Sequence, residues 1–320
     1  MSASKTQERP ADRAASGNAY RVFGLGIRSE IACPGLPIDP RPDRNPDVAI
    51  RLLPPAPEPA EPLENGYYEV RPGVFRFTVQ GVARYLVENG SRISVEPIQG
   101  SSADEVRLFL MGSVLGALLY QRGLFPLHGS AVETRWGAMI FVGAQGVGKS
   151  TLAAAFHRQG YRLLSDDVCA VTARAAGALE VLPAPDQFRL CDDAYRRLDS
   201  PQGARFHVDK FLVPMQQGYC PDAAPLKAIH VLADHDQGDP RFEVLRGFDR
   251  IERLLANLYR PQFLKGQQTE GDLMRLAGQI AQHATIVAVS RMRDPDAIGD
   301  FVHFLESQWA NHFAPEKVEE

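Results

Sequence analysis

The stretch from Gly143 to Thr151 constrains this chain more than any other part of the sequence. It reads GAQGVGKST and matches the pattern G-x4-G-K-[ST] in full. An apolar run, Ala138–Val142, precedes it, and a helix-forming run, TLAAAFHRQG, follows it. The pattern therefore predicts a buried strand, a glycine-rich loop and a helix in direct succession, as in folds that pack helices on a sheet.

A loop of this kind is built to bind phosphate. Its glycines let the backbone wrap closely, so that N–H groups point at phosphate oxygens beside a helix N-terminus. Lys149 can reach the β- and γ-phosphates, and the Ser150 hydroxyl can ligate Mg2+, so we expect ATP and Mg2+ as ligands. The alternative, a glycine-rich turn that binds nothing, is disfavoured by the flanking strand and helix. The expected nucleotide-binding residues are Gly143, Ala144, Gln145, Gly146, Val147, Gly148, Lys149, Ser150 and Thr151.

Two adjacent carboxylates, Asp166 and Asp167, follow a short apolar strand that includes Leu163 and Leu164. If this strand returns to the sheet edge that carries the loop, both carboxylates lie near the phosphates. One would then hold Mg2+ and the other would accept the proton of an attacking hydroxyl, and the sequence does not say which does which. The alternatives are a simple turn or helix cap, or a role for Asp234, which ends the apolar run LKAIHVLAD. We prefer the pair.

His128, in the run PLHGSAVET, precedes the loop strand by about ten residues. If these two strands form a hairpin, His128 can orient a carboxylate or stabilise the charge on the transferred phosphoryl group. We therefore include it with Lys149 and the aspartates as a catalytic candidate. The alternative is a partly buried turn histidine. Arg189 and Lys210 are either anion contacts or solvated surface charges. The other histidines form no metal-binding spacing.

The order of predicted elements divides the chain. Residues 1–17 are polar and predict a disordered tail, and residues 18–122 predict a mostly antiparallel β domain that ends in a buried helix over about 103–121. Residues 123–310 alternate between strand-like and helix-like runs, which is typical of an α/β domain. The last residues, 311–320, predict a second tail.

Composition excludes several classes of function. A length of 320 residues suggests two domains, and a net charge of −4 with a pI of about 6.1 argues against nucleic acid or an anionic membrane as partner. Four widely spaced cysteines fit a reducing cytosol. The longest apolar run, Leu108–Tyr120, is too short to span a bilayer, and the first twenty residues lack the apolar core of a signal peptide. We therefore expect a cytoplasmic protein.

Three motifs together resemble a known family. PLHGSAVE, GAQGVGKST and GYRLLSDDV, in this order, look like the catalytic domain of HPr kinase/phosphorylase, over about residues 123–215. The resemblance implies a P-loop fold of the HPr kinase and phosphoenolpyruvate-carboxykinase type, and ATP- and Mg2+-dependent transfer to a serine. It also implies that His128, the loop, Asp166 and Asp167 line the active site. HPr kinases are oligomeric, so it implies a homo-oligomer as well.

The chain departs from that family in two places. The E-x-R-G signature of the bifunctional enzymes is missing, and PAPDQFRLCDDA and FHVDKFLVP stand in its region. The N-terminal part does not resemble the HPr kinase N-terminal domain. The layout is more similar to the shorter HPr-kinase-like proteins of ribosomal peptide biosynthesis, among them kinases of the C-terminal serine of lasso-peptide precursors. We therefore expect a kinase of a peptide or small protein; the alternatives are a small-molecule hydroxyl kinase and a nucleotide-binding regulatory module without transfer.

Overall fold

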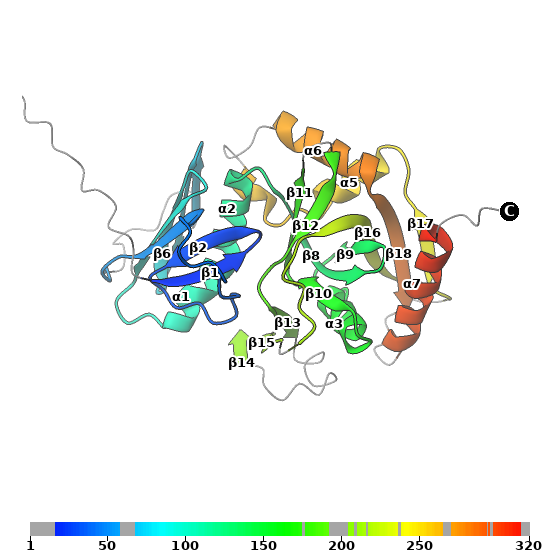
Figure 1. Cartoon of the computed structure of the whole chain (residues 1–320), viewed down its shortest axis with the longest axis horizontal. Helices are drawn as coiled ribbons and strands as arrows, with labels where there is room; N and C mark the ends of the chain where they lie inside the picture. The colour runs from blue at the N-terminus through cyan, green and yellow to red at the C-terminus, as the bar shows by residue number, and fades with distance from the viewer. Residues whose placement is uncertain are drawn as a thin grey trace, which may run out of the picture.

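A computed structural model provides the structure of the chain. The residues that it describes are 17–57, 68–174, 177–191, 204–207, 210–215, 217–235, 238–264, 270–292, 294 and 297–314. The tails expected at 1–17 and 311–320 therefore lie largely outside the described residues. Two sheets, one at each side of Figure 1, enclose a helical layer between them.

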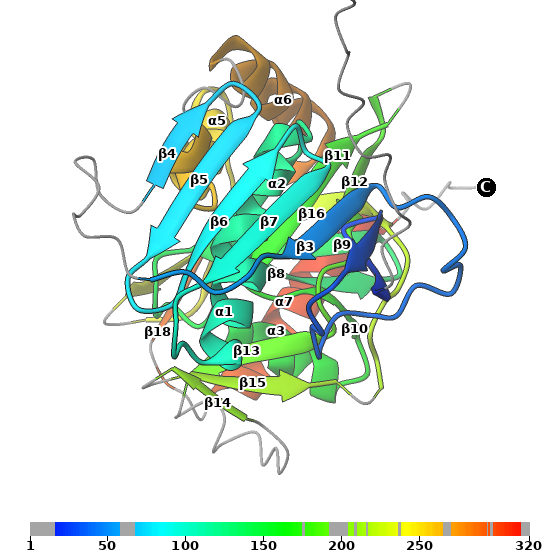
Figure 2. The same cartoon turned by 90° about the vertical axis from the view of Figure 1, so that its left-hand side faces the viewer.

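The N-terminal sheet has seven strands in the order β1-β2-β3-β7-β6-β5-β4. It is mixed, because β3 lies parallel to both β2 and β7 while the other neighbours are antiparallel. Figure 2 shows this sheet face on, with the helical layer behind it. The strands are β1 (Asn18–Val22), β2 (Leu25–Ser29), β3 (Val48–Leu52), β4 (Tyr68–Arg71), β5 (Val74–Val79), β6 (Ala83–Glu88) and β7 (Arg92–Pro97).

The helix expected over 103–121 is present but is not uniform. It consists of α1 (Ala103–Phe109), a π-helical turn η1 (Leu110–Val114) and α2 (Leu115–Gln121). Ser102 caps its start, where its Oγ accepts a hydrogen bond from the backbone N–H of Asp104 at 3.2 Å. All residues from Leu110 to Tyr120 are buried. The sequence pattern is hydrophobic all round because the helix packs against layers on both sides.

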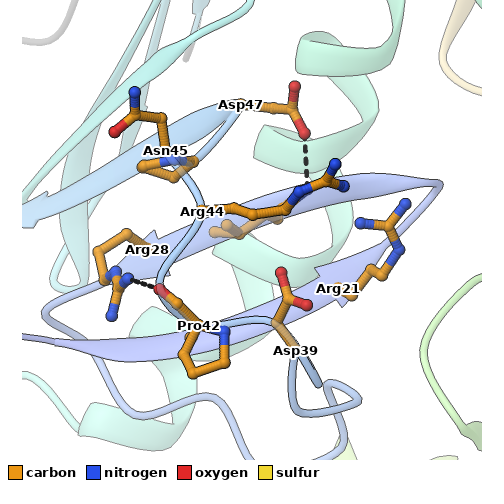
Figure 3. A pocket seen from close by; sticks show the side chains of 11 residues that line it. Arg21, Arg28, Asp39, Pro42, Arg44, Asn45 and Asp47 are labelled. Atoms are coloured by element: carbon orange, nitrogen blue, oxygen red, sulfur yellow. Dashed lines mark hydrogen bonds between the residues drawn. The ribbon is translucent and has the colours of Figure 1, made fainter.

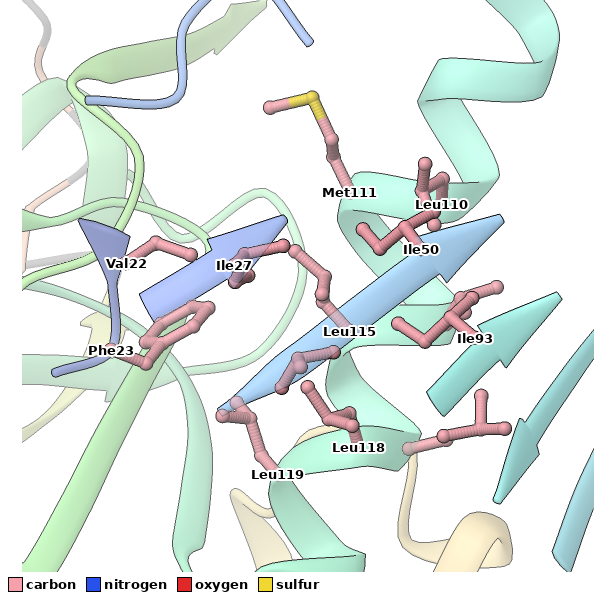
Figure 4. Close-up of a cluster of buried hydrophobic side chains, with 14 of the residues drawn as sticks. Val22, Phe23, Ile27, Ile50, Ile93, Leu110, Met111, Leu115, Leu118 and Leu119 are labelled. Atoms are coloured by element: carbon pink, nitrogen blue, oxygen red, sulfur yellow. The ribbon is translucent and has the colours of Figure 1, made fainter. Parts of the chain in front are cut away.

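The core of this half joins the helix to the N-terminal sheet. Figure 4 shows Leu115 and Leu118 on the helix beside Ile50 and Ile93 of the sheet. Full burial of one such side chain stabilises the fold by roughly 1.5–3 kcal/mol. The same cluster includes Phe263, far along the chain, so the two halves of the molecule share one apolar core.

The second sheet has eight strands, and its centre is parallel. β16 lies between β9 and β18 and runs parallel to both, while β8 forms an antiparallel hairpin with β9. The carboxyl ends of β9, β16 and β18 therefore meet at one edge. The strands are β8 (Phe125–Thr134), β9 (Gly137–Gly143), β10 (Arg162–Ser165), β11 (Val168–Ala173), β12 (Leu179–Leu182), β16 (Ala224–His235), β17 (Arg241–Val244) and β18 (Thr285–Met292).

Alternation along β9 explains how helices cover both faces of this sheet. Ile140 and Val142 belong to the apolar cluster that includes α5 (Asp249–Ala256) and α6 (Glu270–His283). Met139 and Phe141 point the other way, into the cluster with α3 (Lys149–Arg158) and α7 (Ile298–Phe313). A strand buried on both faces is a continuous apolar run in the sequence, and β9 is one.

Two further features complete the fold. α7 extends to Phe313, past residue 310 where the sequence predicts the tail to begin, because Trp309 is fully buried and Phe313 packs against Trp136 at 6.4 Å between ring centroids. A small sheet contains Arg189 and Lys210, whose side chains lie outside the described part of the structure. In the described residues no helix is both long and apolar enough to cross a membrane. The small sheet consists of β13 (Gln187–Cys191), β14 (Ala204–His207) and β15 (Lys210–Pro214).

Candidate functional site

The glycine-rich loop leaves the sheet at the carboxyl edge of its parallel centre. β9 ends at Gly143, which pairs with Leu232 of β16. In open α/β sheets, ligands bind outside the carboxyl ends of the strands, and the loop occupies that position here.

The loop backbone takes conformations that require glycine. Gly148, the residue directly before α3, has φ +96°, in the left-handed region. A residue with a side chain pays roughly 1–2 kcal/mol in this region, so the glycine sets the turn into the helix. Ala144, Gln145 and Gly146 are exposed, whereas Val147 is buried in the cluster beneath α3 and anchors the loop.

Lys149 is folded into the loop. Its Nζ donates hydrogen bonds to the carbonyl oxygens of Gly143 and Ala144, both at 3.0 Å, and the residue is 8% exposed. Ser150 and Thr151 follow in the first turn of α3 and are half-buried. The ammonium group is therefore held at the mouth of the loop, where it can contact a bound phosphate.

The acidic pair lies one strand away from the loop strand. β10 and β11 run along the same side of β8, with Ser165 opposite Ala131 and Val168 opposite His128. The regular pairing is interrupted between them, at Asp166 and Asp167. The predicted hairpin and the predicted return of the strand thus place both carboxylates beside β8, whose other neighbour is β9.

Asp166 is buried and held by a serine. Its Oδ1 accepts a hydrogen bond from Ser130 Oγ at 2.5 Å, and the two residues are 6% and 0% exposed. A hydrogen bond to an ionised acceptor is short and strong, so this contact fixes the direction of the Asp166 carboxylate.

Asp167 lies against His128 in an unusual backbone conformation. Its φ is +79°, where a residue other than glycine is uncommon and strained. The Nδ1 atom of His128 is 3.1 Å from the carbonyl oxygen of Asp167 and 3.7 Å from its Oδ1. The His128 side chain is 35% exposed and that of Asp167 is 12% exposed. This acid–imidazole pair can therefore reach a ligand from solvent.

Cys169, a fully buried residue of β11 two positions after Asp167, is not a candidate nucleophile. Burial raises the pKa of its thiol far above the usual range, and the neighbouring carboxylates of Asp166 and Asp167 raise it further. A thiol is reactive as the thiolate, so Cys169 stays an inert packing residue.

The donor set fits Mg2+ that is shared with a phosphate chain. Among the described residues, no group of three or more His, Cys, Asp or Glu side chains forms a metal cage of its own. Mg2+ is commonly bound by one or two carboxylates together with substrate phosphates, and it prefers oxygen ligands. Asp166, Asp167 and the Ser150 hydroxyl supply such oxygens.

Two residues at this edge carry no assigned role from the sequence. Ser130 lies within the run PLHGSAVET, and its hydrogen bond to Asp166 joins two residues that are 36 positions apart in the chain. Arg291, near the end of β18, pairs in register with Asp234 of β16, two residues past the Leu232–Gly143 pair. Asp234, the competing acid, is exposed and also stands at this edge. Asp234 is indicated in the sequence by one pattern, a polar residue at the end of an apolar strand. Arg291 shows the same pattern.

A separate polar cavity lies in the N-terminal sheet. It has a volume of about 280 Å3 and is lined by residues between Ala19 and Asp47. Figure 3 shows Arg21, Arg28 and Arg44 around Asp39. Asp47 Oδ2 accepts a hydrogen bond from the Gly26 N–H at 2.8 Å. Charges of both signs line this cavity, and it shares no residue with the site at the loop.

Comparison with known proteins finds similarity among solved structures but not among family models or curated proteins. No protein-family model matches the chain, and neither does any curated protein. Among solved structures, the chain is similar to the Hpr(Ser) kinase/phosphatase from Coxiella burnetii, with 12% sequence identity and a TM-score of 0.31. The alignment covers 57% of this chain and 98% of that one.

Proposed function

We propose that this protein is an ATP- and Mg2+-dependent kinase that phosphorylates a serine hydroxyl of a peptide or small protein. The observation that carries the proposal is the convergence of the glycine-rich loop, Asp166, Asp167 and His128 on four neighbouring strands, β9, β8, β10 and β11. Phosphoryl transfer needs a phosphate cradle, a base that accepts the hydroxyl proton and oxygen ligands for Mg2+, and these residues supply each of them.

The geometry supports a division of labour between the two aspartates. We assign proton acceptance to Asp167, because it lies beside His128 and is the more exposed of the two. We assign metal binding to Asp166, together with Ser150, because Ser130 fixes its carboxylate. When bound, Mg2+ would neutralise charge on the phosphate oxygens.

The reaction then has a simple balance. The serine oxygen forms a bond to the γ-phosphorus of ATP as the bond from that phosphorus to the β–γ bridging oxygen breaks, and ADP leaves. The hydroxyl proton passes to the Asp167 carboxylate. Lys149 and the backbone N–H groups of the loop stabilise the charge on the transferred group, which is the main contribution that a protein makes to this chemistry.

For the acceptor we propose a peptide, such as the C-terminal serine of a lasso-peptide precursor. The support is the resemblance of the overall layout of the sequence to the shorter HPr-kinase-like proteins of ribosomal peptide biosynthesis, and the absence of the E-x-R-G signature. A metabolite with a hydroxyl group is the other outcome that the experiment below distinguishes.

The test uses purified protein, Mg2+ and ATP labelled at the γ-phosphate. The acceptors are HPr, free serine and the precursor peptide encoded nearest the gene, and the control is the Asp166→Asn/Asp167→Asn double variant. We expect label on the peptide, lost in the variant. Label on free serine alone would make the protein a small-molecule kinase, and release of free phosphate without any labelled acceptor would contradict the transferase assignment.

A further inference from the structure

Arg291 stands beside the glycine-rich loop although it belongs to a different part of the chain. It is the penultimate residue of β18, and the parallel register with β16 brings it to the sheet edge from which the loop leaves β9. A Cβ atom built at Gly148 would lie 3.1 Å from Nη2 of Arg291. The guanidinium therefore lies close to Gly148, the last residue of the loop before Lys149, and a side chain at that position would force it to shift by a few tenths of an ångström.

The rest of the Arg291 side chain is supported in a way that fixes this position. Its Cζ lies 5.2 Å from the ring centroid of Phe301, a buried residue of α7. Its Nη1 is 3.4 Å from the carbonyl oxygens of Met292 and Asp294. Arg is well suited to bind phosphate oxygens with two parallel hydrogen bonds, because its planar guanidinium carries donors along more than one edge.

We propose that Arg291 is a phosphate-binding residue that contacts the phosphate chain of the nucleotide from the side of the loop opposite to the acidic pair. This inference rests on the proposed function and extends it. β9 separates the two flanks of the site: β8 with the carboxylates lies on one side, and β16 followed by β18 lies on the other. Lys149 and Arg291 then place two positive charges on the phosphates, one from the loop and one from the sheet edge.

A purely structural role predicts different behaviour. If Arg291 only packs on Phe301 and ties down the end of β18, its removal destabilises α7 and weakens every ligand of the site to the same degree. If it contacts phosphate, the loss depends on whether the ligand has phosphates. A comparison of ATP and ADP with adenosine separates the two roles.

The experiment measures binding of ATP, ADP and adenosine by titration calorimetry in the presence of Mg2+, on the full chain. The variants are Arg291→Gln, Arg291→Lys and, as a matched control, Arg241→Gln. Arg241 is exposed on β17 and its neighbour across the pair is Ser290, so this control removes the same charge next to Arg291. Thermal unfolding of each variant reports whether the fold is retained.

We expect Arg291→Gln to weaken ATP and ADP about 10- to 100-fold, since hydrogen bonds to charged groups are among the strong ones, and to leave adenosine within about two-fold. Arg291→Lys should recover part of the loss, and Arg241→Gln should change ATP affinity less than about three-fold. Equal loss of adenosine, or unchanged ATP affinity in a folded Arg291→Gln variant, would overturn the proposal. If the wild type binds no nucleotide, the inference fails together with the proposed function. If nucleotide binds with this pattern but no acceptor is labelled, the transfer reaction fails while Arg291 remains a phosphate-binding residue.

Discussion

Two histidines of the second sheet, His128 and His230, lie in contrasting surroundings within one scaffold. His230, on β16, is fully buried, and its Nε2 accepts a hydrogen bond from the indole N–H of Trp309 at 2.8 Å. Its Nδ1 lies 3.3 Å from the carbonyl oxygen of Ile140, which assigns the ring proton to Nδ1. His128, on β8, is about one-third exposed and lies against Asp167 where the strand pairing is interrupted.

The difference lies in what surrounds each ring. Burial lowers the pKa of His230 from 6.5 to about 4, against a smaller opposing effect of the Ile140 carbonyl, so the ring stays neutral and links β16 to α7. His128 has solvent on one side, a strained aspartate on the other and the loop strand next to it. Regular pairing with satisfied partners indicates a structural residue, and interrupted pairing with strain and partial exposure indicates a functional one.

The largest expected effect is on catalysis and concerns Asp167, the residue that lies against His128. Asp167→Asn keeps the shape of the side chain and removes its ability to accept the serine proton. We expect kcat for transfer to the acceptor peptide to fall about 1,000-fold, within the range for loss of a general base, with ATP affinity nearly unchanged. Steady-state kinetics with labelled ATP measure both quantities.

Asp234→Asn is the matched variant for this test. Asp234 stands at the same sheet edge but is exposed. We expect it to keep at least about one-third of wild-type kcat. If Asp234→Asn loses activity and Asp167→Asn keeps it, the base is at the end of β16 and our assignment of the pair is wrong.

The second effect is on the free energy of unfolding and concerns His230, the buried histidine. His230 binds a proton in the unfolded chain near its ordinary pKa of 6.5 but in the folded protein only near 4. Below pH 6.5 the unfolded state therefore binds more protons, and the free energy of unfolding decreases as the pH falls towards 4. The loss should be on the order of 3 kcal/mol, since one pKa unit corresponds to about 1.4 kcal/mol.

Urea unfolding at several pH values between 7 and 4 measures this dependence. Other groups also titrate in that range, so the comparison uses His230→Gln, whose amide can still accept from Trp309 and donate to Ile140 but does not titrate. The decrease in stability should be clearly smaller in this variant. The same slope in both proteins would show that His230 does not carry the effect.

The third effect concerns Ser130, a fully buried residue that donates a hydrogen bond to Asp166, to which we assign metal binding. Ser130→Ala removes the hydrogen bond to Asp166 and leaves its buried carboxylate with one partner fewer. We expect a loss of roughly 1–3 kcal/mol in the free energy of unfolding and a several-fold increase in the Mg2+ concentration needed for half-maximal activity. Chemical unfolding and a Mg2+ titration of activity check the two parts. A loss of stability without any change in Mg2+ dependence would make Ser130 a structural residue only.

These sites differ in how far the sequence could predict them. The loop with its strand and helix is contiguous, so a local pattern is enough, and the apolar run of β9 reports burial on both faces. The contact of Ser130 with Asp166 and the approach of Arg291 to Gly148 depend on strand register between distant segments, which no local pattern records. The left-handed conformation of Asp167 is likewise invisible, because the aspartate pair is also an ordinary turn sequence. A local pattern is therefore enough to predict phosphate binding at the loop, whereas the residues that surround the loop can be identified only from the tertiary structure.

The smallest expected effect isolates the strain at Asp167. Asp167→Ala and Asp167→Gly both remove the carboxylate, but only alanine keeps a Cβ atom at a φ of +79°. A left-handed conformation costs a residue with a Cβ roughly 1–2 kcal/mol, and glycine gives back part of this through the greater freedom of the unfolded chain. We therefore expect the glycine variant to be about 1 kcal/mol more stable than the alanine variant, with both equally inactive. Urea unfolding of the two variants measures the difference. An alanine variant that is as stable as the glycine variant would mean that the backbone at Asp167 relaxes once the carboxylate is gone, and that the contact with His128, rather than the strand geometry, holds the residue in its strained conformation.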